Sequence, residues 1–327
     1  MSLRLTPPKT MRPLTSSRFP IPDFRLLMLA ASCVPIAVGA QGPGAPRPIF
    51  GQPVASAPPR EVKLVEKPFA ALSDQEPNEK GKLALGIAPE KWKHAETENF
   101  ILHFRRVTEA QKVAREVEYN LWYVATQLGA TKDRYAKRSH VFIFEDDVEW
   151  TKFKGLLGPN GLAWSASFAV GDQLFLNVRG SNGGGFESQT LAHETTHAVV
   201  ARVFRGRRWP LWLNEGFAEY MGGASVAARK GQSTKRFQRA LSGAEVPLAK
   251  LEATTVYPMD PVEVGQLYQS SEKFVRFLMN ELPKDRFVKF IDAVLDGKGM
   301  EKAVLEVYAD KVNDWDSFLR RYERFVK

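Results

Sequence analysis

The stretch that decides the fold is SQTLAHETTHAVVARVFRGRRWPLWLNEGFAEY, which spans residues 188–220. His193 and His197 are four residues apart, so a helix would present both imidazoles on one face, as a metal ion requires. Glu194 follows His193 directly; it can reach a water on such a metal but is turned away from the ligands, which suits a general base. The alternative is a surface helix that carries two histidines by chance. Ser188 can cap this helix, and Gly206 can end it.

A catalytic zinc ion needs a third protein ligand besides an open position. The extended motif with a third histidine is absent, because Val200 and Val203 stand where its glycine and histidine would be. Downstream, Asn214 can cap a second helix that brings Glu215 and Glu219 onto one face. Taken alone, this pattern favours an amphipathic helix with its acids in water. After a two-histidine helix and a tight basic turn, an antiparallel second helix could instead place Glu215 beside the histidines.

The order of elements around this stretch indicates an α+β fold, with strands first and helices later. Thr108 can cap a helix that ends at Gly129. Strands are predicted at residues 100–104, 141–144, 164–170 and 174–178, the last two forming a hairpin around Gly171. A glycine loop at residues 183–185 precedes the two-histidine helix. Further helices are predicted at residues 272–282, 284–295, 300–308 and 313–325.

The N-terminus has the pattern of an exported protein. Basic residues precede an apolar run at residues 26–40, which predicts a secretory signal peptide over residues 1–40 and a periplasmic or secreted chain. An uncleaved membrane anchor and lipidation at Cys33 are the alternatives. The run is short for a membrane span, so none is expected in the mature chain. Residues 41–90 are rich in Pro and Gly and then polar, which indicates a linker. Residues 91–327 are expected to form the folded domain.

The composition limits which residues can bind a metal ion and which partners the chain is expected to have. Cys33 is the only cysteine, so a metal site in the mature chain must use nitrogen and oxygen ligands. Without residues 1–40 the chain has 41 basic and 36 acidic residues, and an excess of +5 argues little for nucleic-acid binding. The remaining histidines, His94, His103 and His140, are scattered along the sequence and are expected to be structural or solvent-facing. The arginines at positions 202, 205, 207 and 208 are expected to complement a helix end.

The pairing of His193-Glu194-Thr195-Thr196-His197 with Trp212-Leu213-Asn214-Glu215-Gly216-Phe217-Ala218 resembles the gluzincin zinc metallopeptidases, and among them the peptidase-MA-like domains. The resemblance implies a zincin-like domain with a small sheet in residues 91–187, metal helices in residues 188–222 and a helical lobe in residues 223–327. It implies that His193, His197 and Glu215 bind Zn²⁺ and that Glu194 activates water. Glu219 would hold His193 in orientation, a role in which a carboxylate also raises ligand basicity.

The same resemblance implies two further parts of the site. Tyr268 is similar in place to a tyrosine that stabilises the oxyanion, with Tyr257 as a rival and a buried structural tyrosine as the plain alternative. The strand at residues 174–178 is a candidate edge strand for pairing with substrate, although an ordinary core hairpin explains it as well. The implied activity is hydrolysis of a peptide or protein substrate. The exopeptidase glycine motif is not evident, which favours an endopeptidase. A non-catalytic peptide- or envelope-binding module and hydrolysis of a non-peptide amide or ester are the alternatives.

Overall fold

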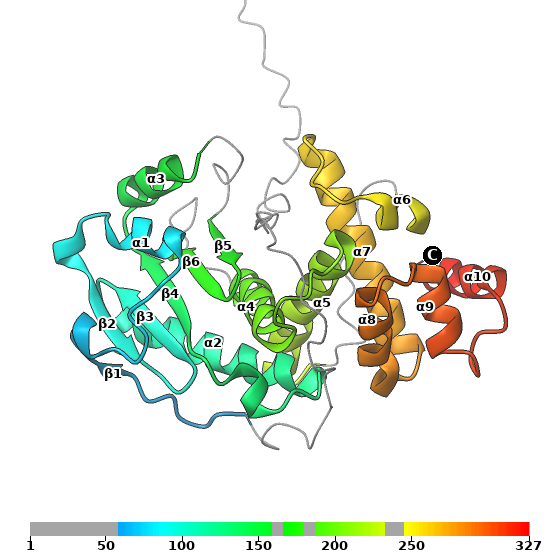
Figure 1. Ribbon diagram of the computed structural model, residues 1–327, viewed down its shortest axis with the longest axis horizontal. Helices are drawn as coiled ribbons and strands as arrows, with labels where there is room; N and C mark the ends of the chain where they lie inside the picture. Colours follow the sequence, from blue (N-terminus) through cyan, green and yellow to red (C-terminus); the bar gives the residue numbers. More distant parts are fainter. Residues whose placement is uncertain (1–57, 159–165, 180–187, 233–244, 327) are drawn as a thin grey trace, which may run out of the picture.

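The computed structural model describes residues 58–158, 166–179, 188–232 and 245–326. Within them, ten α-helices and a six-stranded mixed sheet confirm the α+β class. The sheet lies at one end of the molecule, helices α7 to α10 lie at the other, and α4 and α5 lie between them (Figure 1). The expected signal peptide with Cys33 and the glycine loop at residues 183–185 fall outside the described residues. No helix in the described ranges has the length and apolar character that crossing a membrane requires.

The sheet has the strand order β1-β2-β3-β4-β6-β5. Its strands are β1 (Val65–Glu66), β2 (Lys93–Glu96), β3 (Phe100–Phe104), β4 (Ser139–Phe144), β5 (Ser167–Val170) and β6 (Gln173–Asn177). Strands β3, β4 and β6 are parallel, and the other pairs are antiparallel. The predicted hairpin is confirmed: β5 and β6 meet at Gly171, whose φ of 60° is the left-handed conformation that glycine adopts readily.

The prediction that residues 174–178 form an edge strand is wrong. Strand β6 pairs in parallel with β4, with Val141 opposite Leu174, and on its other side it pairs with β5. The chain therefore turns back at Gly171 and leaves β5 as the edge strand. The apolar pattern could not reveal this, because both strands of the hairpin are buried throughout.

Residues 58–90 belong to the folded domain, which corrects the part of the expected linker that the structure describes. Strand β1 pairs with β2, and helix α1 (Glu79–Leu85) begins at Asn78, whose side chain accepts a hydrogen bond from the Gly81 amide. Gly81 packs so closely that an added Cβ would lie 2.7 Å from the ring of Phe142 in β4. Both elements are too short for a hydrophobic period, which explains why the pattern suggested a linker.

Most of the remaining helices agree with the predicted positions but differ at their starts, and the helices at residues 147–156 and 248–253 were not predicted. They are α2 (Val107–Gln127), α3 (Asp147–Leu156), α4 (Ser188–Val203), α5 (Leu211–Arg229), α6 (Leu248–Ala253), α7 (Pro261–Glu281), α8 (Phe287–Leu295), α9 (Met300–Val307) and α10 (Trp315–Val326). Thr108 lies inside the first turn of α2 rather than capping it, and Asn214 lies inside α5. Helix α7 starts already at Pro261, where Asp260 accepts a hydrogen bond from the Val262 amide.

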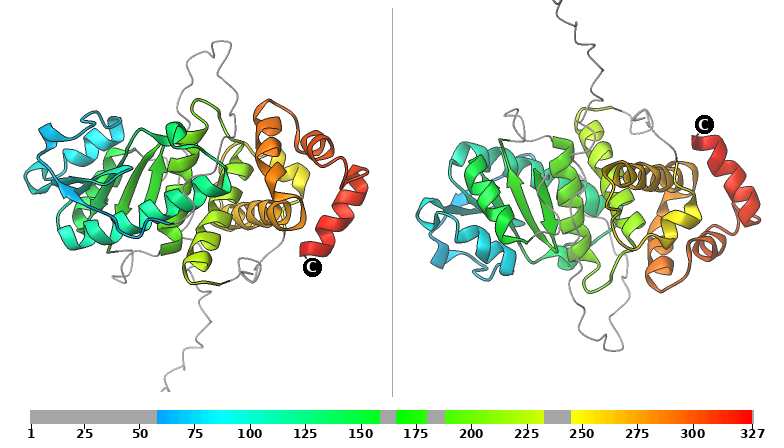
Figure 2. Two further views of the ribbon diagram at one scale, coloured as in Figure 1. Left: turned by 90° about the horizontal axis from the view of Figure 1, so that it is seen from below. Right: turned by 90° about the horizontal axis from the view of Figure 1, so that it is seen from above.

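Two apolar layers cover the sheet. On one face, α2 and α4 pack against side chains that include Leu102, Val141 and Ile143. On the other, α1 and α3 cover an aromatic layer that includes Phe142, Phe144, Phe153, Phe168 and Phe175. The alternation along β4 follows from the two-residue period of a strand. Helix α4 is enclosed between the sheet and α5, and α5 in turn packs on α7 (Figure 2).

Candidate metal centre

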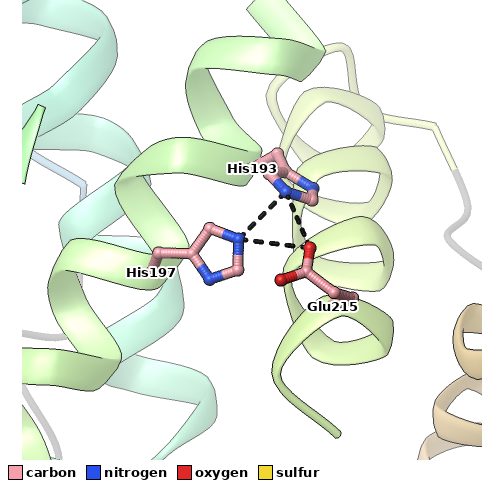
Figure 3. A group of neighbouring side chains, drawn as sticks. All are labelled: His193, His197 and Glu215. Carbon is pink, nitrogen blue, oxygen red and sulfur yellow. Dashed lines mark hydrogen bonds and ion pairs between the residues drawn. The ribbon is translucent and has the colours of Figure 1, made fainter. Parts of the chain in front are cut away.

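The two motif helices bring three potential metal ligands together. His193 and His197 project from α4 and Glu215 from α5 (Figure 3). The two Nε2 atoms are 3.0 Å apart, and Oε2 of Glu215 lies 3.5 Å from each. All three side chains are buried, and a bound cation or a proton would balance the charge of the carboxylate beside the two imidazoles. The predicted convergence of Glu215 on the histidine pair is present, and this group could hold a metal ion.

The two helices approach closely because α5 carries a glycine opposite α4. A Cβ at Gly222 would lie 3.1 Å from the Gln189 carbonyl oxygen and 3.3 Å from the His193 backbone nitrogen. These distances leave little space for a side chain at position 222. The glycine therefore sets the spacing between α4 and α5 on which the ligand geometry depends.

The carboxylate of Glu215 directs one oxygen towards the histidines, and its other oxygen accepts hydrogen bonds. Oε1 accepts hydrogen bonds from the Tyr257 hydroxyl at 2.7 Å and from Asn214 Nδ2 at 3.2 Å. Oε2 has no hydrogen-bond partner among the described residues and faces the two imidazoles. Burial alone would raise the pKa of Glu215, but the charges and hydrogen bonds of His197 and His193 hold that pKa well below its usual range.

Glu194 is a buried carboxylate beside this group, and neither of its oxygens has a hydrogen-bond partner in the described part of the chain. Burial raises the pKa of Glu194 to about 7, although His193 and His197 act in the opposite direction, as does the backbone of Ala169. Ala169 belongs to β5. The carboxylate therefore lies next to the edge strand of the sheet, whose residues are buried.

Glu219 lies where the sequence predicted, on the far side of His193 from the ligand oxygens. Its Oε1 is 3.4 Å from Nδ1 of His193, while Nε2 of the same ring faces Glu215. Burial lowers the pKa of His193, but the carboxylates of Glu215 and Glu219 outweigh burial and raise it well above its usual value. A carboxylate on Nδ1 fixes the ring so that Nε2 is free to bind a metal ion.

The two candidate tyrosines reach the site from different elements and make different contacts. Tyr268 projects from α7; its ring lies nearly parallel to that of His193, with centroids 6.1 Å apart. Its hydroxyl is buried beside Glu215 and Tyr257, although it makes no hydrogen bond of good geometry with either. Tyr257 lies in the connection between α6 and α7, and its hydroxyl donates to Glu215. The ring centroids of the two tyrosines are 6.3 Å apart.

Helix α7 brings Tyr268 to the site because it packs directly on the helix that carries Glu215. A Cβ at Gly216 would lie 2.6 Å from the carbonyl carbon of Ser271, which no side chain can tolerate without backbone movement. Gly216 therefore allows α7 to lie against α5 one residue from the ligand. The ligand Glu215 and the tyrosine are held by the same helix contact.

The other three histidines are neighbours in space, although they are far apart in the sequence. They lie on β2, β3 and β4, where His94 Nδ1 is 2.8 Å from His103 Nδ1 and His103 Nε2 is 2.9 Å from His140 Nδ1. His140 Nε2 lies 3.7 Å from Asp74. Because His103 uses both nitrogens in hydrogen bonds, this row of rings is a structural chain and not a converging ligand set. The expectation that these histidines are structural agrees with these contacts.

Comparisons with protein-family models, with curated proteins and with solved structures found no match.

Proposed function

We propose that this chain is a zinc-dependent peptidase of the gluzincin type, built on a zincin-like fold. The observation that carries the proposal is the convergence of buried polar atoms at one point. The Nε2 atoms of His193 and His197 face each other and Oε2 of Glu215, and neither that oxygen nor the two oxygens of Glu194 has a hydrogen-bond partner among the described residues. Buried polar atoms without partners are costly, and a cluster of them is typical of a site that binds a metal ion or a ligand.

The donor set fits zinc. Two imidazole nitrogens and one carboxylate oxygen are the ligands of several catalytic zinc sites, which leave a fourth position open. Ligand atoms at zinc distances of roughly 2.0–2.1 Å in a tetrahedral arrangement are about 3.3 Å apart. The separations of 3.0 and 3.5 Å found here agree with that value. Two imidazoles and one carboxylate also suit other divalent transition metals, so the identity of the metal as zinc is part of the proposal.

Each residue has a role that follows from its position. A zinc ion bound here would polarise a carbonyl group and lower the pKa of water. Glu194 accepts the proton of the attacking water and gives it to the leaving amine. Tyr268, whose hydroxyl makes no hydrogen bond of good geometry among the described residues, donates a hydrogen bond to the oxygen of the attacked carbonyl.

The edge strand supplies a means of holding an extended substrate. Strand β5 has β6 on one side only, and Ala169 of β5 lies beside Glu194. A peptide that adds to this edge by main-chain hydrogen bonds would pass the general base. We therefore assign to β5 the role that the sequence pattern suggested for residues 174–178. The signal peptide over residues 1–40 remains part of the proposal and implies a substrate outside the cytoplasm.

A non-catalytic binding module is the alternative from another class. It would use the three ligands or the edge strand but has no need of Glu194, whose burial as a carboxylate without a described partner is costly. Hydrolysis of a non-peptide amide or ester uses the same residues. The buried Glu194 therefore favours an enzyme over a binding module, while the substrate class rests on the resemblance and on the edge strand.

The test begins with metal content. We expect one zinc per chain in the purified protein and none in a variant that combines His193→Ala with His197→Ala. We expect Glu194→Gln to keep the zinc but to cleave a library of internally quenched peptides about 10²–10⁴-fold more slowly, because it cannot accept a proton. Zinc without cleavage by the parent would favour the binding module. No zinc after reconstitution would refute the metallopeptidase proposal.

A further inference from the structure

The two tyrosines at the metal centre differ in what their hydroxyls contact, although both rings lie near His193 and Glu215. We propose that Tyr257 is a positioning residue for the metal ligand Glu215: with Asn214 it occupies Oε1, so that Glu215 binds the metal through Oε2 alone. This inference rests on the metal site of the proposed function, but it does not depend on which bond is hydrolysed.

The two carboxylate oxygens of Glu215 differ in their hydrogen bonds. Oε1 accepts from the Tyr257 hydroxyl at 2.7 Å and from Asn214 Nδ2 at 3.2 Å. A carboxylate oxygen with two donors has little remaining capacity to bind a cation, because its lone pairs are in use. Oε2 has no such donor and lies 3.5 Å from each ligand nitrogen. The arrangement favours one-oxygen binding and keeps a coordination position open for water or substrate.

The backbone around Tyr257 is suited to hold its hydroxyl in place. Pro258 follows it directly, which restricts Tyr257 to extended conformations, and Pro261 opens α7 after the Asp260 cap. The neighbouring side chains point outwards: Val256 is 73% exposed and Met259 is fully exposed, whereas Tyr257 packs against the core. A surface connection that directs one hydroxyl inwards just before two prolines loses little conformational entropy when the hydrogen bond forms.

The contacts separate the roles of the two tyrosines. The Tyr257 hydroxyl is already committed to Glu215, so in this arrangement it stabilises the ligand rather than the reacting oxygen. The Tyr268 hydroxyl is buried beside Glu215 and Tyr257 but makes no hydrogen bond of good geometry with either, so it can turn to a substrate more readily than the Tyr257 hydroxyl. A hydrogen-bond partner of a metal ligand acts on metal affinity, whereas a donor to the reacting oxygen acts on turnover.

The test compares two deletions of a single hydroxyl. We expect Tyr257→Phe to raise the zinc Kd by about 10–100-fold in a chelator competition, the range for losing an outer partner of a metal ligand. Tyr268→Phe is the matched comparison, because it removes the same atom from a neighbouring ring that has no hydrogen bond of good geometry to Glu215; its zinc Kd is expected to rise clearly less than that of Tyr257→Phe. In the cobalt-substituted protein, Tyr257→Phe should weaken the visible absorption bands, as expected when Glu215 binds through both oxygens and the coordination number rises.

The second donor gives an independent check. Asn214→Ala should weaken zinc binding in the same direction, and the double variant with Tyr257→Phe should lose less than the sum of both effects, because both donors act on one oxygen. An unchanged zinc Kd and an unchanged cobalt spectrum for Tyr257→Phe would overturn the inference, as would equal losses of affinity in both tyrosine variants. If the parent binds zinc but cleaves no peptide, the affinities still decide this inference. If it binds no metal, the proposed function and this inference both fail.

Discussion

Acidification should destabilise the protein through the chain of three histidines across β2, β3 and β4. His103 and His140 are buried, and burial lowers the pKa of both, with His94 and His140 lowering that of His103 further. Asp74 and Asp172 oppose this for His140, whereas Lys137 adds to it. Arg105 and burial also lower the pKa of His94. A folded state with lowered histidine pKa values binds fewer protons than the unfolded chain, so its stability falls as the pH falls below about 6.5.

The size of the pH effect on the free energy of unfolding follows from the number of protons that the unfolded chain binds and the folded chain does not. Each proton that the unfolded chain binds and the folded chain does not contributes about 1.4 kcal/mol per pH unit to the free energy of unfolding. The two buried histidines therefore give a slope of up to about 2.7 kcal/mol per pH unit between the unfolded-state pKa and their lowered folded-state values. Above about pH 7 the unfolded chain is no longer protonated at these rings, and their contribution becomes constant.

Urea unfolding between pH 7.5 and 5.0, with metal removed by chelation, measures this slope. Glu194 and His193 also titrate differently in the folded state, so the parent is compared with His103→Leu, which leaves the metal centre intact. The variant is expected to be less stable at pH 7.5, because His94 and His140 each lose a hydrogen bond, yet to lose up to about 1.4 kcal/mol less per pH unit. If the stability of the parent and of His103→Leu fell equally per pH unit, the reasoning would be refuted. If His103→Leu does not fold, NMR titration of His140 in the parent is the test, and a pKa of His140 at or above 6.5 would also refute the reasoning.

Three other substitutions test how the metal centre is built. Gly216→Ala should destabilise the protein by about 1–3 kcal/mol in urea unfolding, because its Cβ would meet the Ser271 backbone. Gly265→Ala, a glycine in α7 whose Cβ would have no atom within 4 Å, should instead stabilise it by about 0.5–1 kcal/mol; a comparable loss in both would contradict the steric explanation. Glu219→Gln should weaken zinc binding by about 10–100-fold in a chelator competition through its contact with His193, and unchanged affinity would show that Glu219 does not hold that ring.

The site was predictable where it depends on helical spacing. His193 and His197 lie four residues apart on α4, and Glu215 meets them because α5 packs on α4. Tyr268 was also named from the sequence and lies beside His193. The contact of Tyr257 with Glu215 had no local signal, because it joins a connection to a helix 42 residues earlier in the sequence. Pattern alone could name Tyr257 as a candidate but could not show which group its hydroxyl contacts.

The errors in the fold arose where local signals were short or ambiguous. Asn214 is a common capping residue, but Pro210 takes the capping position of α5 and the Asn214 amide hydrogen-bonds Glu215. The edge strand was misassigned because an apolar period does not show on which side a hairpin pairs. The three clustered histidines come together only through the strand register, which places His94 opposite His103. These features depend on tertiary structure, and no single stretch of sequence contains them.

The ligands come from two helices with different neighbours. Helix α4 packs on the sheet and α2, whereas α5 packs on α7 and through it on the C-terminal helices. An ion held by both helices would cross-link the sheet layer to the helical layer at the boundary between them. Metal occupancy and the cohesion of the two layers would then be a single equilibrium, so any partner that separates the layers would also release the ion, and any chelator would loosen the boundary.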